Sequence, residues 1–159
     1  AGYGDMIGKY SCLNDWKLSH IVNNEPLCEY IYDLTYQTVT AVADMGEKIL
    51  SRDEKSIAAL MRALVIVGIA MAYMGNSRPA SGSEHHLSHY FEVTGLLRGE
   101  PYFCHGIDVA YSTYVTARLR QELQAIETPE AKKNKAFKKE YGLSPSEYQE
   151  LYAHKFSLE

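Results

Sequence analysis

The stretch IAALMRALVIVGIAMAYM, residues 57–74, decides the fold, because almost all of its residues are apolar. A helix that spans a membrane needs about 20 consecutive apolar residues, whereas Arg62 interrupts this run. We therefore interpret the run as the buried central helix of an all-α protein and predict no membrane span. The helix should end near Gly75, and the capping-box pair Ser51 and Glu54 predicts its start.

The rest of the chain also shows helical periodicity and almost no strand alternation. We predict an all-α, antiparallel helical bundle that forms one domain over residues 1–159. The other predicted helices cover residues 5–22, 26–43, the segment that follows Ser81, 105–126, 130–142 and the segment that follows Ser144.

Charge and cysteine content limit the partners and the compartment. The chain has 16 Lys+Arg against 20 Asp+Glu, a net charge of −4, which argues against nucleic acid as a partner. A small-molecule substrate is left open. The three cysteines have no C-x-x-C spacing, so neither a disulfide framework nor a zinc ribbon is predicted. The start of the chain has no signal-peptide pattern, and we expect a cytoplasmic protein.

Three histidines lie close together in the segment EHHLSHYFE, residues 84–92. His85 and His89 are four residues apart and should share one face of a helix. His86 should be turned away from that face. The pair leaves two interpretations open, because the histidines could bind a metal or could simply face the solvent or the core.

Two further residues could complete a metal site. His105 begins a predicted helix after a loop, from where its side chain could reach the histidine helix. Asp5 follows a glycine turn at the start of a helix, where the helix dipole alone also favours a carboxylate. Cys104 is expected to face the core. Asp5, His85 and His105 would provide three ligands and leave coordination positions open, as in catalytic sites.

Three motifs resemble a known superfamily: GDMIGKY at residues 4–10, NSRPASGSEHHLSH at 76–89 and CHGIDVA at 104–110. They are similar to the helical C-terminal domain of the iron-containing alcohol dehydrogenase and glycerol dehydrogenase superfamily, whose fold is dehydroquinate synthase-like. Within it, the middle motif resembles the sn-glycerol-1-phosphate dehydrogenase family, especially its bacterial, arabinose-operon-associated branch. Full-length members have an N-terminal nucleotide-binding domain. Because no dinucleotide fingerprint occurs in this chain, we expect a fragment that is inactive without that domain.

The resemblance implies roles for individual residues. Asp5, His85 and His105 match metal ligands, and His89 matches a histidine beside the substrate, which makes it a candidate proton relay. Lys9 stands where some relatives have another metal-binding histidine, which favours a three-ligand site for zinc or nickel, and we count Lys9 among the substrate-binding residues. The implied reaction interconverts sn-glycerol 1-phosphate and dihydroxyacetone phosphate by hydride transfer with NAD or NADP, whose contacts we do not assign. A homodimer or higher oligomer is left open.

A polar turn precedes the histidine helix. Arg78, with Ser77 and Ser81, could bind the substrate phosphate through its guanidinium group and backbone donors. An arginine in such a turn could equally pin the loop to a neighbouring acid. Ser81 followed by Glu84 is also a capping-box pattern, which predicts Ser81 as the N-cap and Glu84 as the third helical residue.

Two other functions stay open at this point. One is a glycerol or other polyol dehydrogenase of the same superfamily. The other is a helical interaction module without enzymatic activity, in which the acidic and histidine side chains serve only as caps and surface groups.

Overall fold

A computed structural model describes residues 1–126, which are helical and contain no strand. The all-α prediction is therefore confirmed for this part of the chain. The predicted helices at residues 130–142 and after Ser144 lie outside the described residues, and the single domain over residues 1–159 stays a prediction. The helices are α1 (Gly2–Ile7), α2 (Lys9–Asn23), α3 (Glu29–Thr40), the 3₁₀ helix η1 (Ala43–Met45), α4 (Gly46–Leu50), α5 (Glu54–Met74), α6 (Ser83–Arg98) and α7 (His105–Gln124).

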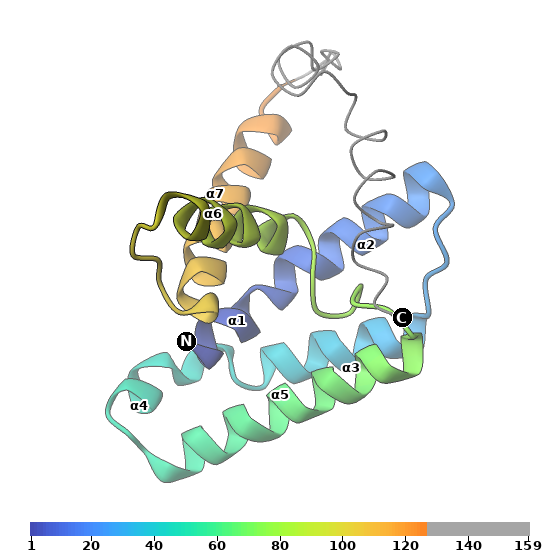
Figure 1. The fold of residues 1–159 in the computed structure, drawn as a ribbon. Helices are drawn as coiled ribbons and strands as arrows, with labels where there is room; N and C mark the ends of the chain where they lie inside the picture. The colour runs from blue at the N-terminus through green and yellow to red at the C-terminus, as the bar shows by residue number, and fades with distance from the viewer. Residues whose placement is uncertain (127–159) are drawn as a thin grey trace, which may run out of the picture. The chain divides into compact units, whose positions relative to one another are not determined.

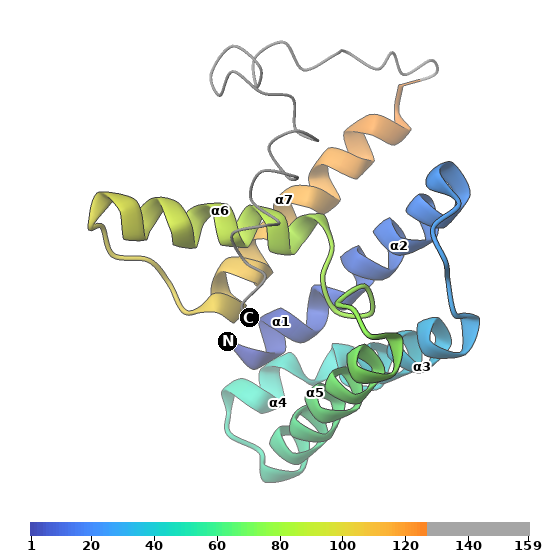
Figure 2. The same ribbon diagram turned by 45° about the vertical axis from the view of Figure 1, so that its right-hand side comes forward.

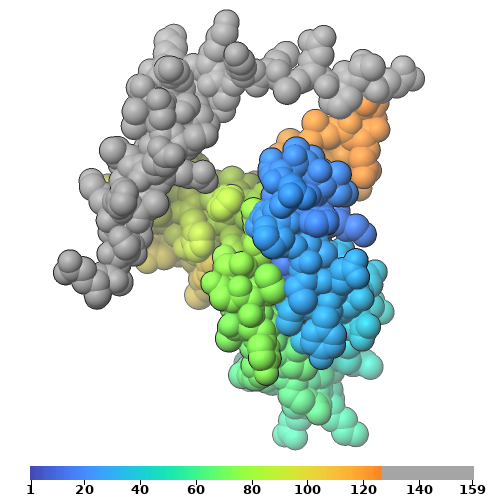
Figure 3. All heavy atoms as spheres, turned by 90° about the vertical axis from the view of Figure 1, so that its right-hand side faces the viewer, coloured from blue at the N-terminus to red at the C-terminus, as the bar shows by residue number. Residues whose placement is uncertain are grey.

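The helices within residues 1–124, which form one compact unit, include two pairs, and both α1 and α2 contact each pair. Helices α3 and α5 lie side by side and run in opposite directions, whereas α6 crosses α7 (Figures 1 and 2). Helix α1 contacts both α5 and α7. Figure 3 shows the surface on which α3 and α5 lie against each other. The short helix α1 therefore links the α3–α5 pair to the helices that carry the histidines.

The core consists of two clusters of buried apolar residues. Trp16 is fully buried in the second cluster, and its indole Nε1 donates a hydrogen bond to the Pro26 carbonyl at 3.0 Å. The first cluster is Met6, Val39, Val42, Leu60, Ala63, Val67 and Ala80. The second is Cys12, Leu13, Trp16, Ile31 and Ala70.

Helix α5 is buried on one face only, so the prediction of a buried central helix is wrong for its other face. Ala63 and Val67 are buried, whereas Met61 and Val65 are 56% and 57% exposed. Among the described residues, α1, α3 and α4 pack against α5 and cover one face. By length and composition α5 could cross a membrane, but core helices of soluble proteins meet the same criterion.

The two ends of α5 were predicted with different success. The helix ends at Gly75, as predicted, where φ is +66° and glycine is the favoured residue. At its start the N-cap is Asp53, whose carboxylate accepts a hydrogen bond from the Ser56 N–H at 2.8 Å, and not Ser51. Arg52 has φ +63° and turns the chain between Ser51 and the helix.

The first two predicted helices also differ from the structure. The helix predicted over residues 5–22 starts earlier and is divided at Gly8 into α1 and α2, so Asp5 lies within α1 rather than in a turn. The second begins at Glu29 rather than Pro26. The Pro26 carbonyl is instead bonded to Trp16, which holds the segment between the helices against α2.

Helix α1 approaches α7 closely because both helices have glycine at the contact. A Cβ atom on Gly4 would collide with the Gly106 carbonyl oxygen, and a Cβ on Gly106 would collide with the Ala1 carbonyl oxygen. Only glycine lets the two backbones meet in this way. The contact brings Asp5, the residue after Gly4, close to His105, the residue before Gly106.

Candidate metal centre

Helices α1, α6 and α7 bring the three predicted metal ligands together. Asp5, His85 and His105 each have one donor atom within 4.8 Å of the other two. His85 Nε2 lies 3.2 Å from Asp5 Oδ1, and the rings of His85 and His105 have centroids 5.2 Å apart. Imidazole and carboxylate groups are ligands that zinc and nickel accept. The geometry suits a three-ligand site, although the role of these residues as ligands stays a prediction.

Glu84 orients His85. Its side chain is fully buried, and Oε1 lies 2.8 Å from His85 Nδ1. A carboxylate on Nδ1 leaves Nε2, the nitrogen nearest Asp5, for other partners, and this arrangement is typical of metal-binding histidines. The sequence indicated only a capping role for Glu84.

The start of α6 differs from the predicted capping box. The N-cap is Gly82, and Ser81 makes no side-chain cap bond, so its prediction as N-cap is wrong. Glu84, the second helical residue rather than the third, does accept the Gly82 N–H at 2.9 Å. The Ser83 N–H is bound instead by the carboxylate of Asp15 on α2, at 2.7 Å. A contact from another helix therefore replaces the predicted local cap.

His89 and His105 share a carboxylate that the sequence did not single out. Glu92 Oε1 lies 2.7 Å from His105 Nδ1, and Glu92 Oε2 lies 3.0 Å from His89 Nδ1. These three residues form a second group with donor atoms within 4.8 Å. Glu92 follows His85 by seven positions, on the same face of α6, and this spacing is the signal that could have revealed it. His86 is exposed and turned away, as predicted.

The charges in the cluster favour a cation. Burial raises the pKa of Asp5, but the His85 hydrogen bond and the Lys9 charge outweigh it and lower the pKa to about 2. Burial lowers the pKa of His85, but hydrogen bonds to Asp5 and Glu84 bring it above its ordinary value. Two carboxylates thus stabilise positive charge at one imidazole. A divalent ion bound to His85 would replace its proton and would meet the same two carboxylates, against the repulsion of Lys9, and carboxylate and imidazole groups are a donor set that fits such an ion.

Lys9 lies beside the cluster. Its buried ammonium group is 3.0 Å from Asp5 Oδ1 and 2.9 Å from the Ala80 carbonyl oxygen. It therefore places a positive charge next to the carboxylate, where a fourth ligand would otherwise be expected from the resemblance. This position agrees with three ligands rather than four. The substrate contact of Lys9 stays a prediction.

Arg78, in the turn before α6, forms an ion pair with Glu25. Its Nε and Nη2 atoms donate to the two carboxylate oxygens of Glu25, both at 2.6 Å. The structure thus contains the pinning contact that the sequence left open. Ser77 is exposed, and its carbonyl accepts the N–H groups of Ala80 and Ser81. The phosphate contacts of Ser77, Arg78 and Ser81 stay predictions.

Cys104 does not face the core as predicted. It is an exposed free thiol in the loop before α7. Its carbonyl accepts the N–H groups of Ile107 and Asp108 at the start of α7, so its backbone rather than its side chain has the structural role.

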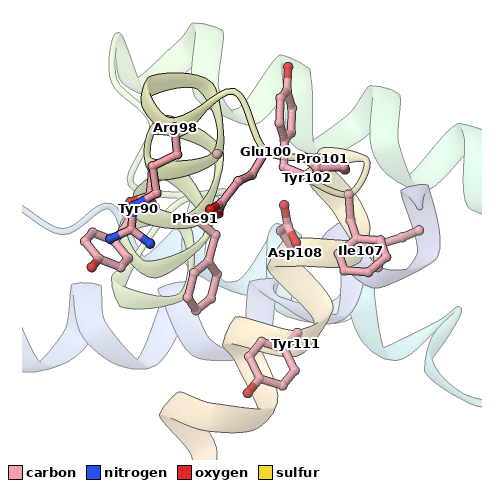
Figure 4. Close-up of a pocket in the computed structure, with 12 residues that line it drawn as sticks. Tyr90, Phe91, Arg98, Glu100, Pro101, Tyr102, Ile107, Asp108 and Tyr111 are labelled. Atoms are coloured by element: carbon pink, nitrogen blue, oxygen red, sulfur yellow. The ribbon is translucent and has the colours of Figure 1, made fainter.

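A pocket of about 590 Å³ lies between α6 and α7 (Figure 4). Five of its twelve lining residues are aromatic, and among them the ring centroids of Phe91 and Tyr111 are 5.9 Å apart. Asp108 also lines it, and its buried Oδ2 has no hydrogen-bond partner within residues 1–126. None of the predicted metal ligands lines this pocket.

The fold and the Asp5–His85–His105 cluster define a helical domain with a candidate catalytic metal centre. The chain matches no family model. It is 48% identical, over 71% of its length and 28% of the relative's, to a glycerol-1-phosphate dehydrogenase [NAD(P)+] of Geobacillus thermodenitrificans. It is 41% identical, over 75% of its length and 30% of the relative's, to the enzyme of the same name from Halalkalibacterium halodurans. It is 36% identical, over 76% of its length and 38% of the relative's, to that of Korarchaeum cryptofilum.

These matches confirm the resemblance that the motifs indicated. The chain is homologous to part of the glycerol-1-phosphate dehydrogenases. It spans 28% to 38% of the length of these three relatives.

Proposed function

We propose that this chain is the metal-binding part of an enzyme that interconverts sn-glycerol 1-phosphate and dihydroxyacetone phosphate with NAD(P). Asp5, His85 and His105 bind one divalent ion, zinc or nickel. The observation that carries the proposal is the approach of these three side chains, from three helices, to within 4.8 Å. The names of the relatives supply the substrate and the cofactor. A cytoplasmic location and a homo-oligomer remain predictions.

The chain's own residues have distinct roles in this reaction. A divalent ion, when bound, supplies a Lewis acid that stabilises negative charge on the C2 oxygen of the substrate. Glu84 holds the His85 ring, and Lys9 offsets part of the Asp5 charge. The His89 side chain is 55% exposed and carries a proton between the substrate and water, a role that suits an imidazole near neutral pH.

Metal analysis of the purified chain tests the ligand set. We expect about one zinc or nickel ion per chain after equilibrium dialysis. His85→Ala removes the most buried histidine of the cluster and should weaken binding at least about 100-fold, or about 2.7 kcal/mol. His86→Ala is the matched control on the exposed face. Equal metal affinity of the two variants, with helical circular dichroism intact, would show that the ligand assignment is wrong.

The ion pair of Arg78 favours a second candidate, a polyol dehydrogenase without a phosphate requirement, because Glu25 engages the guanidinium that a phosphate would need. Binding of glycerol 1-phosphate and of glycerol to the metal-loaded chain separates the two. If Arg78 binds phosphate, Arg78→Ala should weaken glycerol 1-phosphate binding roughly tenfold, and Glu25→Ala should strengthen it by freeing the guanidinium. Glycerol should respond to neither variant. If Arg78→Ala and Glu25→Ala change the affinity for glycerol 1-phosphate in the same direction, Arg78 only pins the loop.

A further inference from the structure

We propose that Glu92 is a positioning residue that fixes His89 and His105 in the same tautomer, with Nδ1–H donated to Glu92 and Nε2 left free. The roles of His105 as a metal ligand and of His89 as a proton relay rest on the proposed function. The hydrogen bonds themselves belong to the chain and can be measured without metal or substrate.

The geometry assigns one carboxylate oxygen to each ring. Oε1 lies 2.7 Å from His105 Nδ1 and Oε2 lies 3.0 Å from His89 Nδ1. An ionised carboxylate can only accept hydrogen bonds, so both Nδ1 atoms must carry the proton. In a neutral imidazole the lone pair is then on Nε2. A single side chain thereby sets the chemical state of two histidines.

The position of Glu92 allows it to act on both α6 and α7. Its side chain is 20% exposed, whereas those of His89 and His105 are 55% and 44% exposed, so the carboxylate is the more enclosed partner. The two rings are nearly parallel, at an interplanar angle of 20° and a centroid distance of 5.4 Å. Glu92 thus aligns a ring from α6 with a ring from the first residue of α7.

The consequence differs for the two histidines. For His105, a fixed Nδ1–H leaves Nε2 as the atom that can join Asp5 and His85 in binding the ion. For His89, the same tautomer leaves Nε2 as the atom that can accept a proton. The metal ligand and the proton relay therefore depend on one carboxylate, in the way that carboxylates behind metal-binding histidines set their tautomer.

Glu92→Gln is the informative substitution because it keeps the size of the side chain. The amide has one oxygen acceptor and one NH₂ donor, so it can accept Nδ1–H from one ring only. The other ring must present a bare Nδ1 to the NH₂ group and move its proton to Nε2. Glu122→Gln, at an exposed position on α7, is the matched control.

Histidine tautomers can be read by long-range ¹H–¹⁵N correlation spectra of the metal-free, ¹⁵N-histidine-labelled chain. The spectra are recorded at about pH 8, well above the ordinary histidine pKa of about 6.5. We expect the Nδ1–H tautomer for His89 and His105 in the native chain and a switch of one of them in Glu92→Gln. An Nε2–H tautomer in either native ring, or unchanged rings in Glu92→Gln, would overturn the inference.

Zinc titration provides the second measurement, because His89, Glu92 and His105 could instead hold an ion of their own. We expect about one ion per chain, and an affinity that Glu92→Gln lowers by roughly 10- to 100-fold while helical circular dichroism is unchanged. Two ions per chain would make Glu92 a ligand and overturn the positioning role. If no ion binds but the tautomers are as expected, the proposed function fails and the positioning by Glu92 stands.

Discussion

Each histidine of the cluster has a carboxylate on its Nδ1 atom. Glu84 serves His85, and Glu92 serves both His89 and His105. Such partners restrict the rotation of an imidazole and decide which nitrogen is available. The carboxylates bound to Nδ1 therefore matter as much for the site as the Nε2 atoms that they leave free.

A substitution of Lys9 tests how its positive charge affects cation binding at Asp5. Its ammonium lies 3.0 Å from Asp5 Oδ1, where it repels any cation bound to that carboxylate. Two unit charges a few ångströms apart interact by several kcal/mol at an effective dielectric constant of about 20. Lys9→Met should therefore tighten zinc binding, by roughly tenfold after partial compensation by solvent.

Competition with a zinc-binding dye measures this change. Lys17→Met is the control, because Lys17 lies away from the cluster, 5.7 Å from the centre of the Tyr32 ring. Unchanged or weaker zinc binding in Lys9→Met would contradict the repulsion and support a structural role for the lysine.

The sequence predicted the residues that converge but not the residue that links two of them. His85, His89 and His105 stood out because histidine is rare and their motifs match a family. Glu92 is one acidic residue among many, and its contact with His105 depends on how α6 crosses α7. Local spacing contains no information on that crossing.

At the scale of the element, the start of α5 distinguishes the observed N-cap from the predicted one. Asp53 accepts hydrogen bonds from both the N–H and the hydroxyl of Ser56, whereas Ser51 Oγ donates to the Lys48 carbonyl before the helix. Asp53→Ala should lower the free energy of unfolding by about 1 kcal/mol, and Ser51→Ala by less than about 0.5 kcal/mol. Urea unfolding measures both, and a larger loss in Ser51→Ala would support the capping box.

The α1–α7 contact gives a second prediction for an element. Gly4→Ala would place a methyl group against the Gly106 carbonyl and should destabilise the chain by roughly 2–3 kcal/mol, a typical cost of overpacking. Gly68→Ala, on α5 with nothing within 4 Å of the added methyl group, should stabilise it by about 0.5–1 kcal/mol. Thermal unfolding compares the two, and stabilisation by both would mean that α1 can move away from α7 at little cost.

Helix periodicity predicted the order of the longer helices better than their number or their junctions. The apolar run of α5 and its end at Gly75 follow from composition and from the conformational freedom of glycine. The glycines around Asp5 look like a flexible turn in the sequence, yet Gly4 lies inside α1 because α7 packs against it. Tertiary contact, not local propensity, decides such positions.

At the scale of the whole molecule, Asp15 connects three helices. From α2 it accepts the Ser83 N–H at the start of α6 and a hydrogen bond from Arg120 of α7, both at 2.7 Å. Burial raises the pKa of Asp15, but the bonds from Ser83 and Arg120 outweigh it and lower the pKa below its ordinary value.

A lowered pKa means that Asp15 stabilises the fold when it is ionised. The contribution is present above the ordinary aspartate pKa of about 3.9 and is lost as the pH falls through the folded-state pKa. Asp15→Asn should cost about 1 kcal/mol at pH 7, and the difference from the native chain should disappear in acid. Asp33→Asn, exposed on α3, is the control. A constant difference from pH 7 to below pH 3, in urea unfolding, would show that the charge is not responsible.

The packing of the helices against one another was the least predictable feature of the fold. Composition and periodicity were sufficient to predict that residues 1–126 are all α-helical, but they implied that α5 would be covered on all sides. The apolar residues of a helix indicate which of its faces can be buried. The neighbouring helices decide which of these faces is in fact buried. Within residues 1–126 those neighbours cover one side.

The Asp5–His85–His105 cluster joins α1 to two helices that lie about 80 to 100 residues further along the chain, so any bound ion would link distant parts of the chain. A ligand that binds only the folded chain raises its melting temperature. At a ligand concentration of 100 times the dissociation constant, the free energy of unfolding rises by about 2.7 kcal/mol. Melting curves recorded over a series of zinc or nickel concentrations would then report occupancy of the site directly, without an assay of turnover.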